Sequence, residues 1–295
     1  MPNLPPLDPA FLARLEALEL SVRQFRWGSR MGGRFLVNRR GSSIEFADYV
    51  AYAPGDDIRS IDWNLYARLD RLFVRTFKEE VELTVEVIVD ATASMRLPTP
   101  QKFERVCQLS LCLAYIALAG HHPVRVSAIA PGRPHATPWH LHRADFSRLT
   151  QWLQAITPGG HVLLSDWMQQ ALPALRIRGG QALLISDGMH EPADAFRALH
   201  LLMRKHLEVK VIQVLTPQEL DPSRLIRGGV LVDSETGRTH ELALNPSELT
   251  QAVMEHNERL ARFCKRNGIL LSQHRVDEPL DVFITKTLPA HRFLE

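Results

Sequence analysis

The sequence predicts an α/β fold, with a mostly parallel sheet that carries helices on both faces. Short runs rich in Val, Ile and Leu alternate with longer segments of helical periodicity, which is typical of β-α-β units. The run 181–186 is apolar almost throughout, as expected for a strand buried on both faces. The chain has 295 residues, 45% of them hydrophobic and 23% charged, so it is an ordinary globular sequence with room for about two domains.

The first 50 residues differ from the rest. Residues 8–27 are predicted to form an amphipathic helix, because Phe11, Leu15 and Leu18 recur at steps of four and three. This helix either docks on its own domain or binds a partner. Residues 28–50 are rich in Gly, Arg and Ser, which favours turns and short strands. The basic stretch 23–40 raises nucleic-acid binding as an alternative, but no recognition motif accompanies it.

From residue 72 onward, strands and helices alternate. The predicted strands are 72–77, 82–90, 124–130, 135–142, 181–186, 209–215 and 269–276. The predicted helices are 102–119, 144–156, 164–176, 193–205 and 246–266. Residues 217–245 interrupt this order and are predicted to be a β-hairpin insertion. We therefore expect an N-terminal helix and β-rich region over 1–77 and an α/β domain over 78–295.

The composition limits the classes of binding partner and the cellular compartment that we expect for this protein. Lys and Arg number 35 against 33 Asp and Glu, a formal net charge of +2, which does not demand nucleic acid or an anionic membrane. Three cysteines are too few for a disulfide framework. No signal peptide precedes residue 9, and the uncharged stretch 106–120 is shorter than the roughly 20 residues of a membrane span. We expect a soluble, cytoplasmic protein with no membrane span.

Oxygen-bearing side chains follow two of the predicted strands. One strand ends in Asp90, Thr92 and Ser94, and another ends in Ser186 and Asp187. Because the carboxyl ends of parallel strands meet at one edge of a sheet, these side chains are expected to lie close together. Carboxylates and hydroxyls with room for water suit Mg²⁺. The alternative is that Asp90 and Ser94 cap a helix and that Asp187 belongs to a turn.

Known catalytic motifs are missing. The chain has no Gly-x-x-x-x-Gly-Lys loop, so we do not expect it to hydrolyse ATP, and it has no Gly-x-Ser-x-Gly elbow. The carboxylates Asp56, Asp57 and Asp62 lie near several arginines and are interpreted as a structural ion-pair network, with Trp63 anchored in a core. The competing hypothesis is a metal-dependent hydrolase that uses this acidic cluster.

The Asp90-x-Thr92-x-Ser94 pattern, together with Ser186-Asp187-Gly188, resembles a von Willebrand factor A domain. In that fold the cluster is a metal-ion-dependent adhesion site, where a partner's carboxylate completes the shell of the metal ion. The upstream segment resembles the signature of a bacterial family, the domain-of-unknown-function family fifty-eight. The matching residues are Pro54, Gly55, Asp56, Asp57, Arg59, Asp62, Trp63 and Arg68.

This resemblance implies a von Willebrand factor A-like, Rossmann-like domain with no known catalytic activity. It also implies a partner, a MoxR-type AAA+ ATPase, with which family members are thought to act as adaptors or chaperone-like proteins toward a protein substrate. The substrate itself is not identified by the sequence.

The match departs from the family pattern at the third loop of the metal site. A Thr normally follows the Gly pair of this loop, but His161 follows Gly159 and Gly160 in this chain. Three interpretations stay open. Mg²⁺ binds through Asp90, Thr92, Ser94 and Asp187 with water in place of the Thr; a different metal uses His161; or the site is a metal-free scaffold.

Overall fold

We describe the fold from a computed structural model of the chain. It describes all residues except 1, 3, 5–6, 22–44, 55–57, 59–60, 79–83, 174–179, 206, 222–229, 233–238 and 242–245. The basic stretch 23–40 lies entirely outside the described residues. The chain divides into two compact units, Met1–Val22 with Leu83–Glu295, and Arg23–Glu82. This division differs from the predicted one, because the first 22 residues belong to the larger unit.

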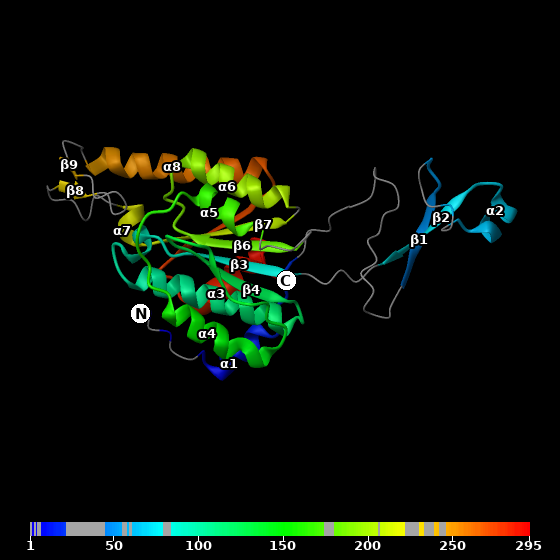
Figure 1. The fold of residues 1–295 in the computed structure, drawn as a ribbon, viewed down its shortest axis with the longest axis horizontal. Helices are drawn as coiled ribbons and strands as arrows, with labels where there is room; N and C mark the ends of the chain where they lie inside the picture. Colours follow the sequence, from blue (N-terminus) through cyan, green and yellow to red (C-terminus); the bar gives the residue numbers. More distant parts are fainter. Residues whose placement is uncertain are drawn as a thin grey trace. The chain divides into compact units, whose positions relative to one another are not determined.

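The larger unit is built on a six-stranded sheet with the order β10-β7-β6-β3-β4-β5 (Figure 1). Its strands are β3 (Val85–Asp90), β4 (Val124–Ile129), β5 (His135–Ala136), β6 (Gln181–Ser186), β7 (Glu208–Leu215) and β10 (Leu270–Arg275). Neighbouring strands run parallel except β5, which pairs antiparallel with β4. The predicted mostly parallel sheet is confirmed. The predicted strand 135–142 is shorter: β5 ends at Ala136, and beyond it the chain meets β4 through a hydrogen bond from the Thr137 N–H to Val126 O and an isolated bridge between His140 and Val124.

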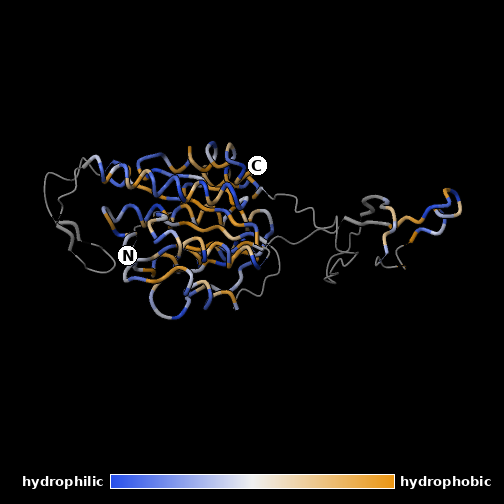
Figure 2. Tube along the Cα trace, turned by 90° about the horizontal axis from the view of Figure 1, so that it is seen from above, coloured by the Kyte–Doolittle hydropathy of each residue, from blue (hydrophilic) through white to orange (hydrophobic). Residues whose placement is uncertain are grey.

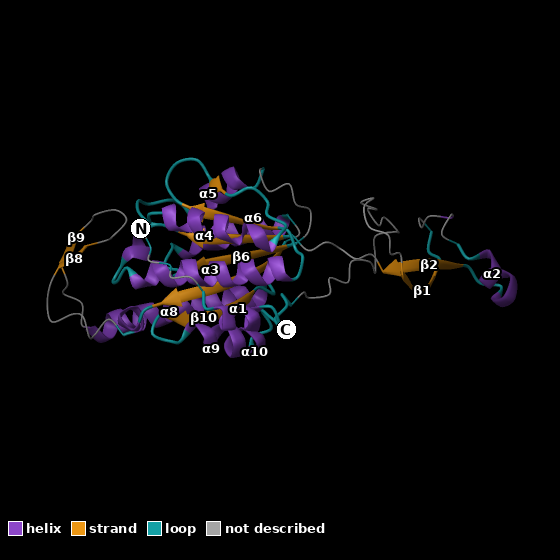
Figure 3. Cartoon of the chain, turned by 90° about the horizontal axis from the view of Figure 1, so that it is seen from below, coloured by secondary structure: helices purple, strands orange, loops and turns teal. Residues whose placement is uncertain are grey.

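Helices cover both faces of the sheet, as predicted (Figures 1 and 3). One face carries α1 (Pro9–Leu15), α3 (Gln101–Ala119), α4 (Phe146–Ala155) and the C-terminal turns α9 (Leu280–Val282) and α10 (Leu288–Ala290). The other face carries α5 (Leu164–Ala171), α6 (Pro192–Arg204) and α8 (Pro246–Arg266). The alternation along β3 explains the two cores: Val85, Val87 and Val89 face the first, and Ile88 faces the second. Figure 2 shows the apolar segments gathered inside this unit.

The N-terminal helix docks on its own domain. Phe11 and Leu15 are buried in the first core, and Glu16 accepts a hydrogen bond of 2.6 Å from the Tyr115 hydroxyl on α3. The helix is shorter than predicted: it ends at Leu15, and Leu20 forms a β-bridge with Leu294 near the C-terminus. The member of the apolar repeat that follows the helix, Leu18, still packs against the first core, so the repeat continues past the end of the helix.

The insertion after β7 begins with the short helix α7 (Pro217–Leu220) and contains an antiparallel strand pair, β8 (Val230–Val232) with β9 (Thr239–Glu241). The smaller unit contains β1 (Glu45–Ala51), which pairs antiparallel with β2 (Phe73–Lys78), and the helix α2 (Trp63–Leu69) between them. Among the described helices, none has the length and apolar character that crossing a bilayer requires.

Candidate functional site at the carboxyl edge of the sheet

The adjacent strands β3 and β6 end side by side and bring Asp90 to the loop after β6. Asp90 Oδ1 accepts hydrogen bonds from the backbone N–H of Thr92 at 3.0 Å and from its hydroxyl at 2.7 Å. Asp90 Oδ2 accepts one from the Ser186 hydroxyl at 2.6 Å and lies 2.8 Å from His190 Nε2. The Thr92 and Ser94 hydroxyls are 3.2 Å apart. Both oxygens of this buried carboxylate therefore have partners.

The surroundings of Asp90 stabilise its ionised form. Burial on its own raises the pKa of a carboxyl group. His190, the Ser186 hydroxyl and the Thr92 N–H outweigh this effect, and the net pKa of Asp90 is lowered. His190 was not among the predicted site residues, although it follows Ser-Asp-Gly by only two positions, because a single His near a loop carries no recognisable spacing.

Lys102 connects three segments of the chain at this edge of the sheet. It lies near the start of α3, and its side chain is fully buried. Its ammonium group donates to Asp187 Oδ2 at 2.8 Å, to Glu219 Oε1 at 2.5 Å and to the Ser94 carbonyl at 3.3 Å. Burial alone would lower the pKa of Lys102, but Asp187 and Glu219 reverse the effect and raise it. These two carboxylates therefore favour the charged form of the lysine among the predicted metal ligands.

Glu219 connects the insertion to this cation. It is the third residue of α7, where it forms a capping box with Thr216. Its Oε2 accepts from the backbone N–H and the hydroxyl of Thr216 at 2.8 and 2.9 Å, which leaves Oε1 for Lys102. The first residues of the insertion are thereby held at the carboxyl edge.

The third predicted loop lies against the first. The backbone N–H of Ala93 donates to Gly160 O, and that of Gly159 donates to Ala91 O, both at 2.9 Å. Gly160 has a φ of +70°, and a Cβ atom at this residue would lie 2.3 Å from Pro131 Cγ, so the position requires glycine. The side chain of His161 is exposed on this loop. Ser165, a hydroxyl further along, donates to Asp194 on α6 instead.

These residues do not fit a divalent cation while Lys102 is in place. Mg²⁺ demands near-octahedral oxygen ligands. Both oxygens of Asp90 are engaged, and Asp187 accepts from the Met189 N–H through Oδ1 and from Lys102 through Oδ2. Within the described part of the chain, no group of three or more His, Cys, Asp or Glu side chains is placed to hold a metal. The Mg²⁺ site stays a prediction that this geometry does not favour.

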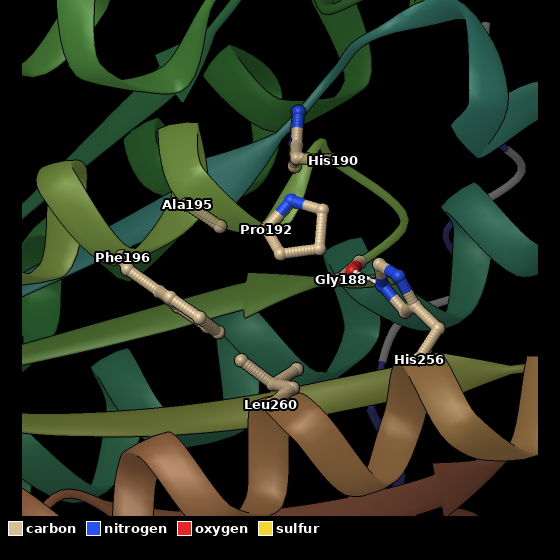
Figure 4. Close-up of a pocket in the computed structure, with 7 residues that line it drawn as sticks. All are labelled: Gly188, His190, Pro192, Ala195, Phe196, His256 and Leu260. Carbon is tan, nitrogen blue, oxygen red and sulfur yellow. Dashed lines mark hydrogen bonds between the residues drawn. The ribbon is translucent and has the colours of Figure 1, made fainter.

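A small hollow lies beside the cluster (Figure 4). His190, Pro192 and Phe196 line one side, and His256 and Leu260 of α8 line the other. His256 Nε2 lies 2.7 Å from the carbonyl oxygen of Gly188. The hollow measures about 180 Å³ even when open solvent is included. Ligand pockets for small molecules are typically ~300 Å³ or larger.

The signature segment belongs to the smaller unit. Asp62 is the N-cap of α2: its Oδ1 accepts from the backbone N–H groups of Asn64 and Leu65 at 2.9 and 3.1 Å, and its Oδ2 accepts from the Tyr49 hydroxyl at 3.1 Å. Pro54 and Arg68 are exposed. Gly55, Asp56, Asp57 and Arg59 lie outside the described residues.

The prediction that Trp63 is anchored in a core is wrong. Trp63 is exposed and meets Tyr66 edge to face, with ring centroids 6.1 Å apart. No residue of the helix α2 is buried, so this helix does not pack Trp63 into a core within the described part of the smaller unit.

The strand order defines the class of the larger unit. Numbered along the chain, the six strands are ordered 3-2-1-4-5-6, the order of doubly wound, Rossmann-like domains. Similar solved structures include the SpRpn10 VWA domain, at 11% identity and a TM-score of 0.42 over 71% of this chain and 96% of that chain. Another is the conserved hypothetical protein BatB from Bacteroides thetaiotaomicron, at 16% identity and a TM-score of 0.40 over 71% and 98%. The fold is von Willebrand factor A-like, as predicted, and its assignment rests on the strand order.

The model of the family described as "Protein of unknown function DUF58" matches residues 48–261, and the chain belongs to this family. The chain is similar to "Uncharacterized protein Rv1480" from Mycobacterium tuberculosis and to "Uncharacterized protein Mb1516" from Mycobacterium bovis. Each is 28% identical over 281 residues, which cover 92% of this chain and 86% of the relative. The predicted family is confirmed.

Proposed function

We propose that the protein is a non-enzymatic adaptor that binds a protein partner through the loops at the carboxyl edge of its sheet. The observation that carries this proposal is that the polar groups of this edge are paired inside the protein, while the loops around them expose apolar side chains. Such an edge offers a contact surface rather than reactive groups. In doubly wound folds this edge is also where ligands bind.

Two leucines form the apolar part of this surface. Leu97 lies on the loop between β3 and α3 and is 49% exposed, and Leu163 lies on the third loop and is 45% exposed. The backbone hydrogen bonds between Ala93 and Gly160 and between Gly159 and Ala91 hold these two loops together. Single exposed leucines are ordinary, but two on joined loops at a ligand-binding edge favour a protein contact.

The hydrolase alternative is less well supported. It requires Asp56, Asp57 or Asp62 as a catalytic carboxylate. Asp62, the one of the three that the structure describes, uses both oxygens to cap α2 and to hold Tyr49. To attack a substrate, the Asp62 carboxylate would need the same lone pairs that accept these hydrogen bonds.

The proposed partner is a MoxR-type AAA+ ATPase, as the family resemblance implies, and a protein substrate of that ATPase is the second. We propose that this assembly works in the cytoplasm. The adaptor supplies no nucleotide hydrolysis of its own in this proposal, so the ATPase supplies the energy.

Binding of the purified ATPase to the immobilised protein tests the proposal. The double variant Leu97→Asp/Leu163→Asp should weaken binding by at least about tenfold, since charge would be buried in the contact. Leu141→Asp is the matched control: Leu141 is 49% exposed, and it follows His140, whose bridge to Val124 places it at the opposite, amino edge. Equal losses in both variants, or no binding of the ATPase in any nucleotide state, would refute the proposal.

A further inference from the structure

The ammonium group of Lys102 makes contacts of the kind that a bound cation makes. It has three N–H donors, and three oxygens accept from it: Asp187 Oδ2, Glu219 Oε1 and the Ser94 carbonyl. Asp187 and Ser94 are two of the four residues that the sequence predicts as metal ligands. A hard cation held by carboxylate and carbonyl oxygens would have the same kind of surroundings.

The environment retains this cation permanently. Lys102 is fully buried, and lysine is almost never buried without a partner. Its two carboxylate partners come from different parts of the chain, Asp187 from the loop after β6 and Glu219 from α7. Loss of either carboxylate would leave a buried charge without its partner. The fold therefore holds the ammonium group in this position.

We infer that the Lys102 ammonium serves as a built-in cation at the carboxyl edge, in the place of a divalent metal ion, and that Glu219 supplies the carboxylate that closes this site from within the chain. A divalent ion among the same oxygens would lie next to the ammonium, and the two cations would repel each other in a buried setting. The inference goes beyond the proposed function and does not depend on which partner the protein binds.

Mn²⁺ binding to the purified full-length protein, followed by electron paramagnetic resonance, tests the inference. Wild type and Lys102→Arg, which keeps the positive charge, should bind no Mn²⁺ at this site. Lys102→Ala leaves Asp187 and Glu219 without their cation, so it should gain a Mn²⁺ site that wild type lacks. Mg²⁺ should raise the melting temperature of Lys102→Ala and leave that of wild type unchanged.

Two results would overturn the inference. The first is tight Mn²⁺ binding by wild type that Asp187→Asn abolishes, which requires no Lys102 variant to fold. The second is a folded Lys102→Ala protein that binds no more Mn²⁺ than wild type. Lys102→Gln, which retains N–H donors but no charge, replaces Lys102→Ala if the latter does not fold. These titrations contain no partner, so their failure is distinct from a failure of partner binding.

Discussion

The ammonium group of Lys102 lies 2.8 Å from the carboxylate of Asp187, although 85 residues separate the two in the chain. Both side chains are almost completely shielded from water. This pair ties the start of α3 to the loop after β6, and Glu219 extends the connection to the insertion. The ion pairs of Lys102 therefore join the loops of the carboxyl edge to one another.

Removing Lys102 should destabilise the protein strongly. Lys102→Met leaves two carboxylates without their cation, and breaking a buried pair from one side costs about 3–5 kcal/mol. Urea unfolding measures this loss. Lys265→Met, at an exposed position of α8, is the control and should stay within about 0.5 kcal/mol of wild type. A loss as small as that of the control would mean that the pair contributes nothing to the fold.

Asp194 on α6 should be required to hold the start of α5. Its carboxylate accepts from the Leu164 N–H at 2.6 Å and from the Ser165 hydroxyl at 2.5 Å. Asp194→Ala leaves these buried donors unsatisfied and should lower the free energy of unfolding by about 1–3 kcal/mol. Asp166→Ala, exposed in the same first turn of α5, should cost much less. Equal urea midpoints for the two variants would contradict this role.

We expect Asp62 to stabilise the smaller unit and to take no part in catalysis. Asp62→Ala removes the cap of α2 and should speed amide hydrogen exchange at Asn64 and Leu65, with a loss of about 0.5–2 kcal/mol in local stability. Tyr49→Phe removes only the bond to Oδ2 and should have a smaller effect. Hydrolysis of an ester or phosphodiester that Asp62→Ala abolishes would instead support the hydrolase alternative.

His274 should make stability depend on acid pH. Its ring is buried against Phe283, and neither ring nitrogen has a hydrogen-bond partner among the described residues. Burial, helped by the positive charge of Arg105 and opposed by Asp277, lowers the pKa of His274 from 6.5 to about 3. Glu278 Oε2 lies 3.3 Å from Nδ1 but does not offset this lowering.

The direction of the effect follows from proton binding. Between the pKa of the folded state, about 3, and that of the unfolded state, 6.5, the unfolded chain binds more protons at His274. Stability is therefore complete above pH 6.5 and falls as the pH decreases through this window, by at most about 1.4 kcal/mol per pH unit. Urea unfolding at pH 5 and pH 7 measures the slope. His274→Leu should show a shallower slope, and identical slopes would disprove the assignment.

Much of the fold could be predicted because burial leaves a local pattern. The apolar runs at 181–186 and 209–215 became β6 and β7 with ends within one residue, and α8 matches the predicted 246–266. The helix at 8–27 was overestimated, because an apolar repeat does not show where its helix ends: Leu18 packs against the first core although the helix stops at Leu15.

The candidate site was predictable only in part. Strand ends placed Asp90 and Asp187 at one edge, since that follows from parallel topology. Lys102 and Glu219 could not be found, because lysine and glutamate are ordinarily exposed and 117 residues separate them. Only the packing of α3 and α7 against the same edge brings them together.

The nuclear magnetic resonance signal of the Lys102 side-chain ammonium group tests the central claim most directly. In protein labelled with ¹⁵N at the lysine side chains, a buried ammonium bonded to three oxygens should give a slowly exchanging signal that Lys102→Arg removes. The signal should persist at the same position when Mg²⁺ is added. A Lys102 signal that exchanges as fast as that of an exposed lysine, or one that Mg²⁺ displaces, would contradict an internal cation at this edge.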